Sequence, residues 1–189
     1  MKKITLTLSA LIVAAGMYAQ EAQWGIKGGL NIAQETVSDG ETGARTGIHL
    51  GGFMEKLISN GVDLQLELLY TMQGGTYKIG SNNYTDKFDY LNVPVIFKIY
   101  VNKNRRFSID IGPQLGFMVS AKYTTGNRTV NVYDNDDLNK FEVAVCLGIS
   151  YKINDKFDFI FHGTGGLTPI VDGEEHKNSG IRLGVGYRF

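Results

Sequence analysis

The strongest constraint on the fold is the alternation of residue types at the end of the chain, from Ser179 to Phe189. From Ile181 onward every second residue is large and apolar, and the residues between them are only Gly or Arg. A period of two separates side chains onto two faces only in an extended strand. The segment also has the length of about ten residues that a tilted strand needs to cross a bilayer. It is therefore predicted to be a strand with one apolar face and one narrow, polar face.

The same alternation recurs along the chain. Seven further strands are predicted, over residues 24–33, 46–55, 62–73, 88–101, 106–121, 140–153 and 156–168. Short turns follow the second, fourth and sixth strands, and long polar connections follow the others, as in barrels with brief periplasmic turns and long outside loops. The sequence thus predicts an all-β fold, an eight-stranded antiparallel up-and-down transmembrane β-barrel with both ends periplasmic. Pro94 and Pro113 interrupt interior strands, where a bulge or a local gap in the ladder is expected.

The amino terminus has the features of an export signal. Lys2 and Lys3 precede an apolar run over residues 4–15, and Ala19 supplies a small residue before Gln20. The run is shorter than the ~20 apolar residues of a spanning helix, so a membrane anchor is the weaker interpretation. Residues 1–19 are therefore predicted to be a signal peptide, and residues 20–189 a single barrel domain.

Side-chain volume indicates which face of the strands is outside. A soluble barrel of the lipocalin type would show the same alternation with its polar face outward. The interior of an eight-stranded barrel is only just wide enough for side chains to fill, and the apolar faces are too bulky for it. These faces are therefore expected to contact the lipid of the outer membrane. An aromatic girdle is predicted at their periplasmic ends, formed by Trp24, Phe107, Tyr151, Phe157, Tyr187 and Phe189.

Ten charged residues are predicted to face the lumen, five of each sign. They are Lys27, Asp63, Glu67, Lys98, Asp110, Glu142, Lys152, Asp158, Arg182 and Arg188. An isolated buried charge is far more costly than a paired one, so these residues are expected to form a salt-bridged network that fills the lumen. A water-filled pore is not expected.

Other candidate sites are weak. His49 and His162 lie on strands that are far apart, His176 lies in a loop, and no metal site is predicted. The acidic residues 134–137 lack the glycine and the closing glutamate of a calcium loop and are interpreted as a surface loop. Residues 172–179 contain acids, His and Ser without a recognisable catalytic spacing, so neither catalysis nor a cofactor is expected. Cys146 cannot form an internal disulfide and is interpreted as an inert lumen thiol.

Several segments together suggest a family. They are GIKGGLN at 25–31, QLELLYTMQG at 65–74, YLNVPVIFK at 90–98, GPQLGF at 112–117 and LGVGYRF at 183–189. The chain resembles the PorT-like family of small outer-membrane β-barrel proteins of Gram-negative bacteria. The resemblance implies the fold and the outer-membrane location, and it links named members to the assembly of a protein-secretion and gliding apparatus. Tyr187 and Phe189 resemble the terminal signal by which the barrel-assembly machinery recognises such proteins.

Two functions of different class are consistent with the sequence. The first is a non-enzymatic structural or protein-interaction barrel that contacts a partner through its outside loops or its periplasmic rim. The alternative is a small-molecule binding or transport barrel, either porin-like or soluble and lipocalin-like. The 19 basic and 19 acidic residues cancel, so nucleic acid is not an expected partner. The expected partners are outer-membrane lipid, the barrel-assembly machinery and a protein.

Overall fold

The computed structural model describes residues 22–189 apart from 38–39, 81, 127, 172 and 174–175. The predicted signal peptide, residues 1–19, lies outside the described residues. Among the described residues, no helix is long and apolar enough to cross a membrane.

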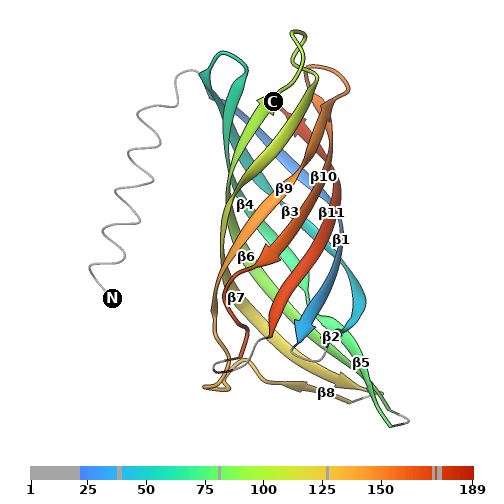
Figure 1. The fold of residues 1–189 in the computed structure, drawn as a ribbon. Helices are drawn as coiled ribbons and strands as arrows, with labels where there is room; N and C mark the ends of the chain where they lie inside the picture. Colours follow the sequence, from blue (N-terminus) through green and yellow to red (C-terminus); the bar gives the residue numbers. More distant parts are fainter. Residues whose placement is uncertain (1–21, 38–39, 81, 127, 172, 174–175) are drawn as a thin grey trace, which may run out of the picture.

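Eight long antiparallel strands form a closed ring (Figure 1). In order around the ring they are β1 (Gln23–Val37), β3 (Gly43–Ser59), β4 (Val62–Gln73), β6 (Asn82–Tyr100), β7 (Phe107–Thr125), β9 (Phe141–Lys152), β10 (Phe157–Gly166) and β11 (Lys177–Arg188). The pairing of β11 with β1 closes the ring, and each neighbouring pair follows the chain order. The predicted eight-stranded up-and-down barrel is confirmed.

The two faces of the wall have the reverse of the usual polarity of a soluble protein. Large apolar side chains such as Leu147 (57%) and Phe117 (47%) are exposed on the outside. Charged side chains such as Lys98 (1%) and Asp158 (2%) are buried inside. Exposed apolar surface on this scale is stable only against lipid, so the outward faces form the membrane-contacting surface of an outer-membrane barrel.

The short connections lie together at one end of the barrel, which is the predicted periplasmic end. A tight turn with Gly61 at φ +86° joins β3 to β4, and residues 101–106 and 153–156 join the other two pairs of strands. The carboxyl-terminal Phe189 lies at the same end, where its backbone N–H donates to the Trp24 carbonyl at 3.0 Å. The first described strand and the last strand therefore meet at this rim.

Aromatic rings gather on the outside of this rim. Tyr187 lies between Phe157, with ring centroids 5.1 Å apart, and Phe189, at 5.9 Å. On the neighbouring strands Phe107 is paired with Tyr151. Trp24, at the start of β1, is also exposed. These side chains occupy the predicted position of the girdle.

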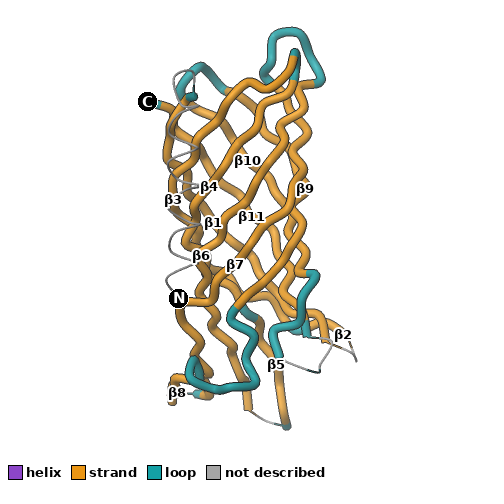
Figure 2. The backbone as a smooth tube through the Cα atoms, turned by 90° about the vertical axis from the view of Figure 1, so that its left-hand side faces the viewer, coloured by secondary structure: helices purple, strands orange, loops and turns teal. Residues whose placement is uncertain are grey.

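At the opposite end β6 and β7 continue beyond Leu91 and Val119, where the exposed large apolar residues of the membrane-contacting band end on these strands. Their ends project from the barrel wall together with β5 and β8 (Figures 1 and 2). β6 and β7 are each 19 residues long. The short strands β5 (Gly75–Ile79) and β8 (Arg128–Asn131) pair with their ends, and β2 (Gly40–Glu41) pairs with β1. We call β5, residues 82–87 of β6, residues 122–125 of β7, and β8 the extracellular extension.

The prediction of loops over residues 34–45, 74–87 and 123–139 is therefore wrong in part. Much of each segment is strand, because β1, β3, β6 and β7 extend into them and β5 and β8 are added. Neither face of the extension contacts the hydrocarbon of the membrane, so its hydrophobicity does not alternate. Its Thr and Tyr residues nevertheless favour extended backbone, so the segment can form strands without an alternating pattern.

The two prolines leave gaps in the ladder without changing the register. Beside Pro94, β4 and β6 lack paired residues over two positions, and beside Pro113, β6 and β7 do the same. The register is unchanged on either side of each gap. The register shift between β6 and β7 occurs elsewhere, between Asp89 and Tyr90.

The lumen also accepts some large apolar side chains, each beside a glycine. Phe53 and Leu69, which interrupt the polar faces in the sequence, both point inward and are buried. They pair with Gly25 and Gly51 on neighbouring strands. A Cβ at Gly25 would lie 2.4 Å from the Phe53 ring, so a larger residue there would collide with it. Glycines on the inner face therefore make room for large neighbours.

Candidate functional site

The barrel lumen contains all ten of the charged residues predicted to face it. Nine are buried, and Lys152, at the periplasmic end, is partly buried. They come from seven strands, because period-two alternation delivers a side chain to the lumen from every strand of the ring. The arrangement differs along the barrel axis.

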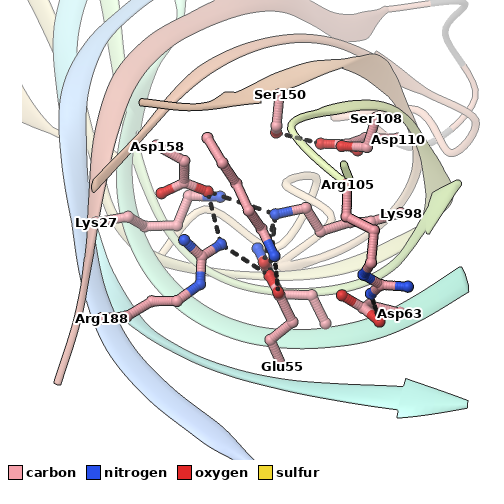
Figure 3. Close-up of polar contacts among 12 residues, drawn as sticks. Lys27, Glu55, Asp63, Lys98, Arg105, Ser108, Asp110, Ser150, Asp158 and Arg188 are labelled. Atoms are coloured by element: carbon pink, nitrogen blue, oxygen red, sulfur yellow. Dashed lines mark hydrogen bonds and ion pairs between the residues drawn. The ribbon is translucent and has the colours of Figure 1, made fainter. Parts of the chain in front are cut away.

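A network of five charged residues fills the periplasmic part of the lumen (Figure 3). Glu55 accepts hydrogen bonds from Lys98 and Arg188, each at 3.0 Å, and from Lys152 at 3.3 Å. Asp158 accepts from Arg188 at 3.0 Å and from Lys98 at 3.4 Å. We call these five residues the periplasmic ion network. Two carboxylates thus share three cations, which partly offsets the cost of removing each charge from water.

Glu55, the residue with the most partners in this network, was not among the residues predicted to face the lumen. Glu55 continues the inward series of Gly47, His49 and Gly51, but Phe53 interrupts the polar character of that face. Strict counting by two past Phe53 would have placed Glu55 in the lumen.

A second residue missed from the sequence is Arg105, in the turn between β6 and β7. Its guanidinium pairs with Asp63 at 2.5 Å and lies over the Tyr100 ring at 4.3 Å. Its φ of +52° is unusual for a residue with a side chain. No periodic pattern marks a turn residue, and its partner Asp63 is brought near only by the register of β4 and β6. Arg105 extends the charge pairing to the periplasmic rim.

The middle of the lumen holds separate pairs. Lys27 and Glu67 form an ion pair at 2.7 Å. Asp110 lies 2.8 Å from the Nε2 atom of His162 and accepts hydrogen bonds from Ser108 at 2.6 Å and from Ser150. These contacts link β7 with its neighbour β9, and they link β1 with β4 and β7 with β10, which are each separated by one strand in the ring.

The prediction that all ten charges pair with one another is correct for five of them, which are Lys27, Glu67, Lys98, Asp158 and Arg188. Asp63, Asp110 and Lys152 pair instead with Arg105, His162 and Glu55, which lie outside the ten. For Arg182 and Glu142 the prediction of a charged partner is wrong. Arg182 donates to Gln114 and to the Cys146 sulfur, both at 3.0 Å, and has no carboxylate within 4.0 Å among the described residues. Glu142 instead accepts from the Asn178 amide at 2.7 Å. Neutral amides thus satisfy part of the hydrogen-bonding capacity of Arg182 and Glu142.

The predicted balance of five acids and five bases is also wrong. Glu35, Glu55 and Asp86 are further buried carboxylates on the inner face, so acids outnumber the Lys and Arg residues of the strands. His176 lies near one of them, with its Nε2 atom 2.8 Å from Glu35. The excess acids Glu35 and Asp86 lie toward the extracellular mouth.

An apolar cluster covers the extracellular mouth. Ile170, in the loop after β10, is buried against the inward-facing Phe88, Tyr90 and Met118. The loop after β8 meets it, because the Asn139 N–H donates to the Ile170 carbonyl at 2.8 Å. An isolated bridge between Leu138 and Val171 adds to this contact, and the side chains of Val132, Tyr133, Leu138 and Val171 border the cluster. Charged side chains therefore fill the periplasmic end of the lumen, and apolar side chains cover its extracellular end.

The remaining candidate residues are dispersed. His49 and His162 point into the lumen, and His176 lies in the loop that covers it. Within the part of the chain that the structure describes, no group of three or more His, Cys, Asp or Glu side chains could hold a metal ion. Cys146 is buried beside Arg182.

Comparison with known proteins agrees with this architecture. The crystal structure of Ail, the attachment invasion locus protein of Yersinia pestis, superimposes with a TM-score of 0.55 at 16% identity, covering 90% of this chain and 100% of that one. The crystal structure of Neisserial surface protein A gives a TM-score of 0.61 at 14% identity, with the same coverage. At these identities the likeness concerns the fold alone. No curated protein matches the sequence. The sequence model described as "Outer membrane protein beta-barrel domain" matches residues 18–172, and the chain belongs to this family.

Proposed function

We propose that the protein is a non-enzymatic outer-membrane barrel with a closed lumen that presents its extracellular extension to a protein partner. The observation that carries this proposal is the contrast between a lumen filled with side chains and strands that continue beyond the membrane-contacting band. A transport barrel needs a path through its lumen, whereas an interaction barrel needs an ordered surface outside the membrane.

The edges of the extension suit the addition of a partner strand. β8 pairs with β7 and with no second strand among the described residues. An unpaired edge presents backbone donors and acceptors to another chain. The Val132 N–H donates to the Ala121 carbonyl on β7. Backbone groups alternate in direction along a strand, so the N–H groups of Thr129 and Asn131 point toward the free edge.

The extension is braced on its inner face. The rings of Tyr77 and Tyr84 stack at 5.5 Å, and Tyr123 lies 5.5 Å from Tyr84. These residues lie on three adjacent strands, so the cluster holds β5, β6 and β7 together. A preformed edge binds a partner strand with less loss of conformational entropy than a flexible loop would.

The resemblance to the PorT-like family supports a partner that belongs to a protein-secretion apparatus. The porin-like and lipocalin-like alternatives have less support, because the periplasmic ion network and the apolar cluster occupy the space that a solute would need.

Cross-linking in cells tests the proposal at the free edge. A photo-reactive amino acid at Val130 should cross-link to one protein, and Thr129→Pro should abolish the product by removing an edge donor while leaving the ladder with β7 intact. Thr129→Val retains the N–H and is the matched control. An unchanged cross-link in the Thr129→Pro variant would exclude strand addition at β8.

A further inference from the structure

Two lysines lie directly opposite each other on the outer face of the extracellular extension. Lys87 on β6 is paired with Lys122 on β7. Their strand neighbours Phe88 and Ala121 are buried against the inner face, so both lysines point outward. Like charges directly opposite each other destabilise a sheet. Among the described residues, neither ammonium has a carboxylate within 4.0 Å.

Asp89 is an acid on the same face, and its contacts lead away from the lysines. Asp89 is paired with Ser120, one step closer to the membrane. It takes part in a hydrogen bond with the Tyr70 side chain on β4 and interacts electrostatically with Arg45 on β3. The lysine pair is therefore available to an anion from outside the protein.

The height of the pair corresponds to the headgroup layer of the outer leaflet. The continuous apolar series on the outside of these strands ends at Leu91 on β6 and Val119 on β7. The rings of Phe117 and Phe141, 5.4 Å apart, mark the outer edge of the band. Lys87 is four residues beyond Leu91, which on a tilted strand corresponds to about 10 Å. Headgroups occupy a layer of about 5 to 8 Å outside the hydrocarbon, which the long lysine side chains can reach from this height.

A row of hydroxyl groups lies immediately above the lysines on the same face. Thr76, Thr85, Thr124 and Thr129 stand directly opposite one another across β5, β6, β7 and β8. The middle two are each two residues from a lysine, so the row shares the outward face with the lysine pair. The hydroxyl oxygens of Thr124 and Thr129 lie 3.2 Å apart. Hydroxyl groups both donate and accept, as the hydroxyls of a sugar do.

We infer that this face binds a phosphorylated glycolipid of the outer leaflet. The apolar wall contacts its acyl chains, Lys87 and Lys122 bind a phosphate, and the threonine row contacts its sugars. The vertical order of these three surfaces matches the order of the parts of such a lipid. The site does not depend on the protein partner proposed above, because it uses the outer face of the sheet and not its edge.

Binding to the purified barrel tests the inference. The folded protein in nonionic detergent is titrated with a short-chain lipopolysaccharide, with the same lipid after phosphatase treatment, with phosphatidylglycerol and with inorganic phosphate. The expected result is binding of the untreated lipid, weakened about thirtyfold in the Lys87→Gln/Lys122→Gln variant, since each lysine near an anionic surface contributes about a factor of five. Lys103→Gln, in a periplasmic turn, is the matched control and should bind normally.

The other arms decide between sources of the phosphate. Equal binding of the dephosphorylated lipid, or normal binding by the double Gln variant, overturns the assignment to the lysines. Equal binding of phosphatidylglycerol overturns the assignment to a glycolipid, and displacement of the lipid by millimolar phosphate alone indicates a site for the free anion.

Thermal unfolding gives an independent readout. Without lipid, the double Gln variant should unfold at the same temperature as the native protein or at a higher one. Added lipopolysaccharide should raise the unfolding temperature of the native protein more than that of the variant.

Discussion

The most direct test of the lumen concerns Glu55. Replacement by Gln preserves the shape of the side chain and removes one charge from the periplasmic ion network. Lys98 and Arg188 would then share Asp158 alone, and Lys152 would lose the one carboxylate within 4.0 Å of it among the described residues. Removing one partner of a buried ion pair costs about 3 to 5 kcal/mol, because the other charge stays buried and unpaired. We expect Glu55→Gln to lower the free energy of unfolding by an amount in this range.

Urea unfolding of the barrel in lipid vesicles measures this change. Trp24 is the single tryptophan and is 53% exposed on the membrane-contacting face, so its fluorescence should report loss of the lipid environment. Asp136→Asn, in an exposed loop, is the control and should change the free energy of unfolding by less than about 0.5 kcal/mol. Adding Lys152→Gln to Glu55→Gln should recover part of the loss, since it removes the cation left unpaired. A loss below about 1 kcal/mol for Glu55→Gln would refute the view that this network stabilises the barrel.

Three further predictions concern the closed lumen, the inner glycines and the final residues. The purified barrel in a planar bilayer should show negligible ion conductance, and stable large current steps would show that the lumen is open. Gly51→Ala should destabilise the barrel by about 1 to 3 kcal/mol, because its Cβ would lie 1.9 Å from the Leu68 carbonyl oxygen; Gly165→Ala, whose Cβ would have no neighbour within 4 Å, should be neutral by the same urea titration. Replacement of Tyr187 and Phe189 by Ala should leave refolding in detergent intact but cause accumulation of unfolded protein in the periplasm, seen as loss of heat-modifiable migration on gels; assembly in cells at the normal rate would limit both residues to the girdle.

The fold was predictable because the membrane imposes a simple rule on the sequence. Every membrane-crossing strand must present one face to lipid and the other to a narrow lumen, so residue type alternates strictly. The bounds of β4, Val62–Gln73, coincide with the predicted strand for this reason. Beyond the band neither face contacts the hydrocarbon of the membrane, the rule no longer applies, and the strand character of residues 75–79 and 128–131 could not be read from alternation.

The partners inside the lumen could not be predicted in the same way. Alternation tells which side chains point inward, but the pairing depends on the stagger between strands that are far apart in sequence. Glu55 and Arg188 meet although 133 residues separate them. Arg182 shows the converse: it was expected to pair with an acid, and the register places it beside Gln114 and Cys146 instead.

The pairing of β1 with β11 also determines when the barrel can close during folding. Gly25 is paired in register with Arg188, so the ring cannot close until nearly the whole chain has been delivered to the membrane. Until then β1 has an unsatisfied edge, open to any other extended chain in the periplasm. Contacts between such distant residues also form slowly. The open chain is therefore exposed to aggregation at this edge until β1 and β11 pair.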